Sequence, residues 1–493
     1  MGDGALRIGH RIAALAPVLL LGAALACPAT GQGPEASGYL ADRLPLPADV
    51  LPSCMAVRPD GTLVVGSMDG DVLLVVDEDG DGIPETYRRW AGTLPHWPLG
   101  MAVEGDEVVI STRSALLRLA DDDGDGWAER WTTVTDAWDV TRDHHDWTTG
   151  IARWTDGSYV VSPVTDDVRE RSVEGRHHLR GKAIAVDPDD GSVEVLAGGL
   201  RYPTGWATRS RDGLVFFTDN QGQQKTNCEI NVLRPGHWYG YPSQADPPSG
   251  PEDAEPYTPA VLIPYPWARS VNGLAFAETG GEFGPLEGQL VLCEYNHRFI
   301  LRATLEEVDG QIQGACYPFL GGLLGPLTLA FAPDGTLYVG SIREPSWGGE
   351  AEQGAIYRVR PTGQPAFGIL EANAEPDGFT LRFLAEPPDP DLALDPARYS
   401  LRRYHHEFQG SYHSPPTDVE PLSVASVSPG DDARSVRLAV REPLIPGRIY
   451  EIRADLPGAE PDISHYTMNR VPSPAKEDPT RVRNDAERRR EKE

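Results

Sequence analysis

Residues 199–222 read G-L-R-Y-P-T-G-W-A-T-R-S-R-D-G-L-V-F-F-T-D-N-Q-G. This stretch contains two runs of strand-forming residues, 206–208 and 214–218, separated by a short turn that ends in Asp-Gly. Loops crowded with polar residues flank the two runs. Apolar strands that carry polar loops are typical of a rigid scaffold that presents a binding site. The stretch therefore predicts one β-rich unit together with a cluster of candidate functional residues.

The same unit recurs along the chain. Its marker is an apolar residue followed by Ala, and a turn and an apolar strand come after it. The six markers are Met55-Ala56, Met101-Ala102, Ile151-Ala152, Trp206-Ala207, Leu274-Ala275 and Leu329-Ala330. Successive markers are 46, 50, 55, 68 and 55 residues apart. A period of this length is typical of a β-propeller with one four-stranded blade per copy. We therefore predict an all-β, six-bladed β-propeller; unrelated sandwich strands, the competing interpretation, would not repeat one marker.

Propeller geometry assigns the loops to two faces. The strand that carries the marker, strand A, is expected to be innermost at the central channel, and strands B, C and D follow outward. The short A–B turns and the C–D turns then share one face. The long polar D–A and B–C loops share the other face, which is where we expect a small ligand to bind.

The domain organisation follows from a change of pattern after the sixth copy. A chain of 493 residues is too long for one ordinary domain unless that domain is a large repeat. We assign residues 38–360 to the propeller. Residues 366–472 alternate β-rich runs with Pro, Gly and Asp turns, which predicts a small antiparallel β-sandwich of immunoglobulin or fibronectin type III character. Residues 473–493 have almost no apolar content and are predicted to be disordered.

The N-terminus has the pattern of an export signal. Arg7 and Arg11 precede an apolar run that is too short for a convincing transmembrane helix, and a small-residue cleavage pattern follows. We expect a signal peptide at 1–26, a linker at 27–37 and an exported protein, periplasmic or extracellular. Cys27 directly follows the cleavage pattern, so a lipid anchor at this residue is an alternative to free release.

The composition narrows the range of partners. The formal net charge of −30 argues against nucleic acid and anionic lipid as binding partners.

Four cysteines remain apart from Cys27, and an even number in an exported protein predicts up to two disulfides, with three pairings open. These cysteines are Cys54, Cys228, Cys293 and Cys316.

Two acidic loops match each other and resemble cation-binding loops. Each has carboxylates at positions 1, 3 and 5, Gly at position 6 and Glu at position 9, and such hard oxygen ligands suit Ca²⁺. Each loop joins strands C and D of its blade, so we interpret them as structural calcium sites opposite the ligand face, with a solvated acidic turn as the alternative. The proposed ligands are Asp77, Asp79, Asp81 and Glu85 in the first loop and Asp121, Asp123, Asp125 and Glu129 in the second.

Candidate binding residues gather in the loops of the long-loop face. His144 and His145 come just before an innermost strand, and imidazole is the usual general base near neutral pH, although a histidine pair also suits a metal. No motif of a serine hydrolase, zincin, P-loop enzyme or dinucleotide-binding protein stands in its proper context. Further candidates for ligand or cofactor binding are Arg201, Tyr202, Asp219, Asn220, Gln221, Glu229 and Asn231.

Three segments resemble one known family. G-L-R-Y-P-T-G-W-A, F-F-T-D-N-Q-G and C-E-I-N-V-L-R-P-G-H-W-Y-G-Y-P are similar to motifs of the soluble quinoprotein glucose/sorbosone dehydrogenases, which are exported six-bladed propellers. The whole chain looks like planctomycete-type secreted members with a C-terminal β-sandwich. Three stretches depart from the family pattern. Tyr202 stands where the family has Asn, and H-H-D-W-T-T-G at 144–150 replaces the family's His-x-Gly-Gly with different spacing. Residues 218–222 replace an acidic/His/Gly loop.

The resemblance implies an activity. It implies a pyrroloquinoline quinone (PQQ) cofactor with calcium beside it, a sugar or polyol substrate that loses hydride to the quinone, and an electron-acceptor protein as partner. Arg201 would match the family's cofactor-contacting arginine, and His144 or His145 would be the base. The alternative function is a non-catalytic propeller that binds carbohydrate or protein with the same face, and a propeller hydrolase or lactonase with channel calcium is a third.

Overall fold

The computed structural model describes residues 38–80, 83–84, 86–95, 97–140, 145–165, 179–222, 224–241, 255–345, 353–364, 367–410, 412–456 and 462–474. The expected signal peptide and linker lie outside these residues, as does the C-terminal tail from residue 475. Among the described residues, none of the helices is long and apolar enough to span a membrane.

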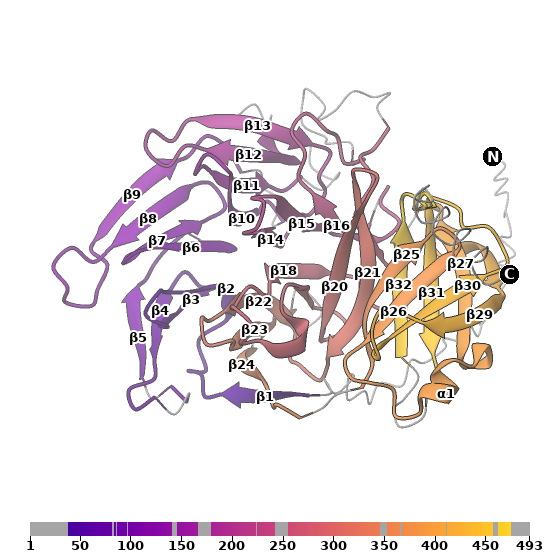
Figure 1. Ribbon diagram of the computed structural model, residues 1–493. Coiled ribbons are helices and arrows are strands. Elements are labelled where there is room, and N and C mark those ends of the chain that lie inside the picture. The colour runs from indigo at the N-terminus through magenta and orange to yellow at the C-terminus, as the bar shows by residue number, and fades with distance from the viewer. Residues whose placement is uncertain are drawn as a thin grey trace, which may run out of the picture.

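The first part of the chain forms the predicted six-bladed β-propeller (Figure 1). Each blade is an antiparallel sheet in which successive strands run outward from the channel. Blade 1 contains β2 (Pro52–Val57), β3 (Leu63–Ser67), β4 (Val72–Val76) and β5 (Thr86–Ala91), and blade 2 contains β6 (Gly100–Glu104), β7 (Glu107–Ser111), β8 (Leu116–Ala120) and β9 (Arg130–Thr135). Blade 3 contains β10 (Thr148–Arg153), β11 (Tyr159–Pro163), β12 (Lys182–Val186) and β13 (Val193–Gly198), and blade 4 contains β14 (Trp206–Thr208), β15 (Val215–Asp219), β16 (Cys228–Val232) and β17 (Val261–Ile263). Blade 5 contains β18 (Val271–Phe276), β19 (Leu290–Glu294), β20 (Phe299–Val308) and β21 (Gln311–Leu320). A 3₁₀ turn, η2 (Gly284–Leu286), precedes β19.

The sixth blade closes the ring with a strand from the other end of the propeller. Its inner strands are β22 (Pro326–Phe331), β23 (Leu337–Arg343) and β24 (Gln353–Pro361), and its outer strand is β1 (Tyr39–Leu44). β1 pairs antiparallel with β24, from Tyr39 opposite Pro361 to Leu44 opposite Ile356. The first described strand therefore joins the first and last blades.

The repeat marker occupies the inner strand of every blade, as the sequence predicts. The marker side chains of Met55, Met101 and Trp206 are buried, and the Trp206 ring stacks on Phe217 with centroids 5.0 Å apart. Neighbouring inner strands approach each other closely. A Cβ atom added at Gly100, for example, would lie 1.5 Å from the carbonyl oxygen of Gly150 on the next inner strand. The Gly that precedes the marker in blades 2 to 5 thus permits the tight packing around the channel.

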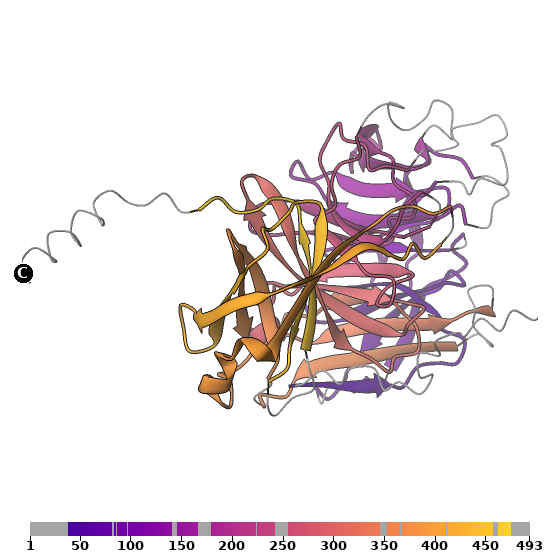
Figure 2. The same cartoon turned by 90° about the vertical axis from the view of Figure 1, so that its right-hand side faces the viewer.

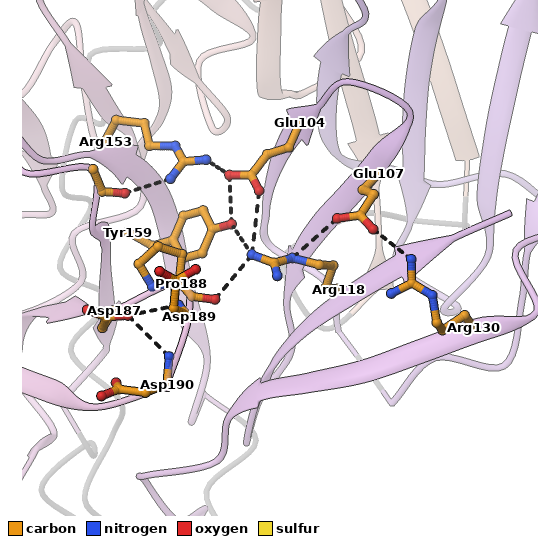
Figure 3. Close-up of polar contacts among 11 residues, drawn as sticks. Glu104, Glu107, Arg118, Arg130, Arg153, Tyr159, Asp187, Pro188, Asp189 and Asp190 are labelled. Atoms are coloured by element: carbon orange, nitrogen blue, oxygen red, sulfur yellow. Dashed lines mark hydrogen bonds and ion pairs between the residues drawn. The ribbon is translucent and has the colours of Figure 1, made fainter. Parts of the chain in front are cut away.

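A polar network joins blades 2 and 3 on the face of the A–B and C–D turns (Figure 3). The Oη of Tyr159 donates a hydrogen bond to Glu104 at 2.7 Å and accepts one from Arg118 at 3.1 Å. Glu107 lies between Arg118 and Arg130, at 3.5 and 2.7 Å. Because these charged side chains are partly exposed, each ion pair contributes little to the stability of the fold.

The C-terminal segment forms the predicted β-sandwich. One sheet has the order β25-β26-β30-β29, and the other has the order β32-β31-β27-β28. The elements are β25 (Ile369–Glu375), β26 (Gly378–Phe383), α1 (Pro390–Ala393), η4 (Pro396–Arg398), β27 (Tyr399–His406), β28 (Pro416–Leu422), β29 (Val424–Pro429), β30 (Ser435–Val440), β31 (Arg448–Ala454) and β32 (Asp462–Met468).

The sandwich shares a sheet with the propeller. β32 pairs with β21, the outer strand of blade 5, so blade 5 continues into the sandwich as one eight-stranded sheet. Figure 2 shows the sandwich packed beside the propeller. Tyr466 of β32 is fully buried and accepts a hydrogen bond from Gln313 of β21 at 2.6 Å. The two domains are therefore joined through main chain and core rather than by a linker alone.

The disulfide prediction is wrong for this structure. Cys54, Cys228, Cys293 and Cys316 are all free and buried. Each packs as a small apolar side chain on a strand of a blade, and burial raises the pKa of the Cys54 and Cys228 thiols to about 12. An even count of cysteines does not reveal that each thiol points into the packed core.

Candidate active site

A cavity of about 410 Å³ lies at the mouth of the channel on the long-loop face. One residue from each blade surrounds it, and each of these residues stands two positions before its repeat marker. They are Ser53, Leu99, Thr149, Thr204, Asn272 and Leu327. The six-fold repeat of the sequence thus produces a six-membered ring of side chains.

Hydroxyl groups of this ring tie one blade to the next. Ser53 Oγ donates to the carbonyl of Pro98 at 2.6 Å, and Thr204 Oγ1 donates to the carbonyl of Val271 at 2.6 Å. Thr149 Oγ1 donates in the same way to the carbonyl of residue 203. In each case the acceptor directly precedes the ring residue of the following blade. These hydroxyls therefore hold the framework, and we do not assign them as nucleophiles.

The functional wall of the cavity comes from blades 3, 4 and 5. The D–A loop before β10 supplies an imidazole and an indole, the loop before β18 supplies a guanidinium and a hydroxyl, and the B–C loops of blades 4 and 5 supply amides and a phenol. These residues are His145, Trp147, Arg269, Ser270, Asn220, Tyr295 and Asn296. The described lining residues include no carboxylate, so the wall offers neutral groups that can donate and accept hydrogen bonds, and one fixed positive charge.

Aromatic rings pack behind the imidazole. The His145 ring lies 5.3 Å from Trp147 and 6.0 Å from Tyr202, centroid to centroid. Trp147 in turn contacts Trp97 at 6.2 Å. This packing fixes the ring of His145 at the cavity and restricts access of water to one side of it.

A buried ionic group lies behind the wall at blade 4. Nζ of Lys225 is 2.7 Å from Glu229 Oε2 and 3.2 Å from Asp219 Oδ2, and it also donates to the carbonyl of Tyr239 at 2.8 Å. Asn231 donates to Glu229 at 3.1 Å. Burial alone would lower the pKa of Lys225, but the two carboxylates raise it. One cation thus faces two carboxylates, and burial raises the pKa of Glu229 although Lys225 opposes the shift. None of these three residues is among the described lining residues of the cavity.

In blades 4 and 5, the side-chain carboxylate of the last residue of strand B anchors the loop that precedes strand A of the same blade. In blade 4, Asp219 accepts hydrogen bonds from the backbone N–H groups of Arg201 and Tyr202, at 3.0 and 2.7 Å. In blade 5, Glu294 accepts from the N–H groups of Arg269 and Ser270, at 2.9 and 2.8 Å. The same device thus anchors both loops at the polar wall. Burial raises the pKa of Glu294, although these hydrogen bonds oppose the shift.

Arg201 lies outside the cavity. Its Nη2 donates to Oη of Tyr412 at 2.8 Å, and its Nη1 donates to the carbonyl of Gln221 at 3.0 Å. The guanidinium lies over the Tyr202 ring, 4.7 Å from the centroid. Gly222 is needed beside it, because a Cβ atom there would lie 2.4 Å from the guanidinium carbon.

The structure divides the sequence-predicted residues into two groups. His145 and Asn220 line the cavity, and His144 lies outside the described residues. The others stand behind the wall and support it: Arg201, Tyr202, Asp219, Gln221, Glu229 and Asn231. Sequence reasoning missed Lys225 and the ring hydroxyls. The signal for Lys225 is a single lysine between two acidic residues of the sequence. The signal for the ring hydroxyls is their fixed position two residues before the repeat marker.

The acidic loops lie on the opposite face, as predicted. In the second loop, carboxylate oxygens of Asp121, Asp123 and Glu129 lie within 4.8 Å of one another. Asp125 is not one of these three, and it accepts a hydrogen bond from the N–H of Trp127 at 2.9 Å. In the first loop, Asp77 accepts from the N–H of Gly80 at 2.7 Å. The expected ligands Asp81 and Glu85 lie outside the described residues.

Solved structures share the propeller fold. A protein assigned as an oxidoreductase (glucose dehydrogenase) from Thermus thermophilus is 21% identical, with 65% of this chain and 100% of that chain covered and a TM-score of 0.51. A Trichoderma reesei protein of carbohydrate-active enzyme family AA12 is 14% identical, with 68% and 98% covered and a TM-score of 0.52. The expected likeness to quinoprotein dehydrogenases is thus confirmed at the level of the fold.

Comparison with known protein families gives a separate result. No curated protein matches the chain. One family model, a domain of unknown function (DUF7133), matches residues 54–361, which is most of the propeller. The chain belongs to this DUF7133 family.

Proposed function

We propose that the protein oxidises a hydroxyl group of a sugar or polyol in the channel-mouth cavity, with PQQ as the electron acceptor. The observation that carries this proposal is the donor set of the wall. The guanidinium of Arg269 and the amides of Asn220, Asn272 and Asn296 face a cavity whose described lining lacks carboxylates. Such donors fit the carboxylates and carbonyl oxygens of PQQ, and the volume is within the usual range for small ligands.

His145 is the proposed general base. A bound PQQ would supply the hydride acceptor, so that oxidation at the carbinol carbon would give the carbonyl compound. The hydroxyl proton of the substrate passes to the imidazole of His145, which lines the cavity and is packed against Trp147. His144, the other candidate base, is not placed by the described residues.

The aromatic side of the cavity suits a sugar. Trp147 presents a large apolar ring to the cavity, and its neighbours Trp97 and Tyr202 restrict its movement. The apolar C–H face of a sugar ring would lie against the indole, while Ser270 would hold one of its hydroxyl groups. This arrangement would orient the substrate before the proton is removed.

We assign calcium to the acidic loops rather than to the cavity. Asp121, Asp123 and Glu129 bring hard oxygen atoms together on the far face. The proposed roles of these loops are structural. Three further parts of the proposal are supported by the sequence alone. They are export, a lipid anchor at Cys27 and transfer of electrons to an acceptor protein.

The second candidate function is non-catalytic binding of carbohydrate or protein by the same face. The position of Arg201 favours it, because the arginine that would contact the cofactor is held against Tyr412 instead. Arg269 is then the single cationic side chain among the described lining residues.

Reconstitution separates the two functions. The purified protein would be incubated with PQQ and Ca²⁺ and assayed for dye reduction with a panel of sugars and polyols. The dehydrogenase proposal expects turnover that falls by about 10²–10⁴-fold in His145→Gln, the usual contribution of a general base. Binding of a sugar without any dye reduction would support the non-catalytic function instead.

A further inference from the structure

Two residues of the C-terminal sandwich contact the loops that carry the cavity wall. Tyr412 and His413 belong to the connection between β27 and β28 and touch loops that lie between 148 and 211 residues earlier in the chain. Tyr412 is 47% exposed, yet its hydroxyl accepts the hydrogen bond from the buried Arg201. The contact therefore joins a surface residue of one domain to the interior of the other.

Tyr412 is the outer member of a stack of side chains that ends at the cavity. The guanidinium of Arg201 lies 5.5 Å from the Tyr412 ring and 4.7 Å from the Tyr202 ring. The Tyr202 ring contacts both His145 and Trp147, at 6.0 and 5.9 Å, and these two residues line the cavity. These groups form a continuous packed path from Tyr412 to the imidazole of His145.

His413 makes two further contacts with cavity-bearing loops. Its backbone N–H donates to Oε1 of Gln221 at 3.2 Å, and Gln221 directly follows the cavity residue Asn220. Its ring stacks on Tyr265, with centroids 3.8 Å apart and planes 5° from parallel. Tyr265 belongs to the same loop as the cavity residue Arg269.

We propose that Tyr412 and His413 are positioning residues for the cavity, so that the C-terminal sandwich holds the blade 4 and blade 5 wall in its ligand-binding geometry. Neither side chain lines the cavity. Tyr412 acts through Arg201, and His413 acts through Gln221 and Tyr265. The shared sheet between β21 and β32 supplies the rigid base from which this connection reaches over the propeller. The inference applies to any ligand of the cavity and goes beyond the proposed oxidation.

Hydrogen exchange tests the inference without a ligand. In the full chain, Tyr412→Ala with His413→Ala removes the hydroxyl that accepts from Arg201 and the ring that stacks on Tyr265, while the backbone N–H of residue 413 remains. Amide exchange at residues 219–222 and 265–272 is expected to be about 10-fold or more faster, as expected for loss of a hydrogen bond to a charged group. Tyr412→Phe, which keeps the ring and loses the hydroxyl, should give an intermediate rate. Phe408→Ala is the control, because Phe408 is 39% exposed in the same connection.

Titration with PQQ provides the functional arm of the test. The double variant should bind PQQ about 10-fold or more weakly than the unaltered protein, with the melting temperature unchanged. Unchanged exchange in the two segments, or equal exchange in the double variant and in Phe408→Ala, would overturn the positioning role. If the unaltered protein does not bind PQQ, the cofactor proposal fails, while the exchange result still decides this inference.

Discussion

Lys225 lies between the carboxylates of Asp219 and Glu229, and all three side chains are buried. Lys225→Met would leave two carboxylates without their counter-ion. We expect this variant to lose about 3–5 kcal/mol of unfolding free energy, as for other broken buried ion pairs. Urea denaturation measures the loss.

The control for this prediction is Lys182→Met. Lys182 is half-buried, and burial lowers the pKa of its ammonium group. Removing this charge should therefore change stability by less than about 1 kcal/mol. Equal effects of the two substitutions would show that the ionic group at blade 4 does not hold the loops together.

The residues of the site differ in how far the sequence reveals them. His145 could be predicted because it precedes an inner strand, where a side chain reaches the channel. Asn220 could be predicted because it follows strand B of blade 4. The position of Arg201 could not, because its partner Tyr412 comes from a different domain, and chain order does not show which distant hydroxyl a buried guanidinium will find.

His465 of β32 makes the domain junction sensitive to acid. It lies against Trp267 of the propeller, and its Nδ1 is 2.9 Å from Oη of Tyr404. Burial, assisted by the charge of Arg402, lowers the pKa of His465 to about 3. The folded state therefore keeps this imidazole neutral, and its stability is complete above the unfolded pKa of about 6.5 and is lost as pH falls from there toward 3.

The size of this effect can be measured with His465→Gln. Between about pH 7 and about pH 4.5, the unaltered protein should lose about 2–3 kcal/mol more stability than the variant, since each pKa unit corresponds to about 1.4 kcal/mol. Urea denaturation at the two pH values provides the comparison, with the exposed His237→Gln as control. An equal pH dependence in His465→Gln and the unaltered protein would contradict the assignment.

The loop between β8 and β9 gives a prediction for calcium. If Asp121, Asp123 and Glu129 bind Ca²⁺, calorimetric titration should show binding that is lost in Asp123→Asn, and a chelator should lower the melting temperature. Asp125→Asn should have a smaller effect, because Asp125 is not part of this group of three carboxylates. A plain acidic turn would show neither the heat of binding nor the chelator effect.

At the scale of the molecule, β1 is the closing strand of the ring. Its Tyr39 donates a hydrogen bond to the carbonyl of Phe283 at 2.7 Å, and its Leu44 is buried. A chain that begins at residue 46 should therefore expose the edge of β24 and aggregate or melt at a markedly lower temperature. A chain that begins at residue 38 should retain the full melting temperature. Equal melting of the two chains, measured by calorimetry, would show that blade 6 does not need this strand.

The blade count could be predicted from sequence, whereas the closure could not. The marker recurs in every inner strand because all six must pack around one channel, so its spacing reveals the number of blades. An outer strand such as β1 carries no marker, and its partner β24 is more than 300 residues away. The sheet shared by β21 and β32 escaped prediction for the same reason, since strand pairing between domains leaves no periodic signal.

Titration of the unaltered protein with PQQ, followed by the fluorescence of tryptophan, tests the central claim most directly, because Trp147 lines the cavity. We predict saturable quenching with one equivalent of PQQ, and binding weakened by about 10-fold or more in Arg269→Gln, as expected for loss of a charge-assisted hydrogen bond. Absence of saturable quenching, or equal affinity in Arg269→Gln, would contradict the assignment of the cavity as a quinone-dependent active site.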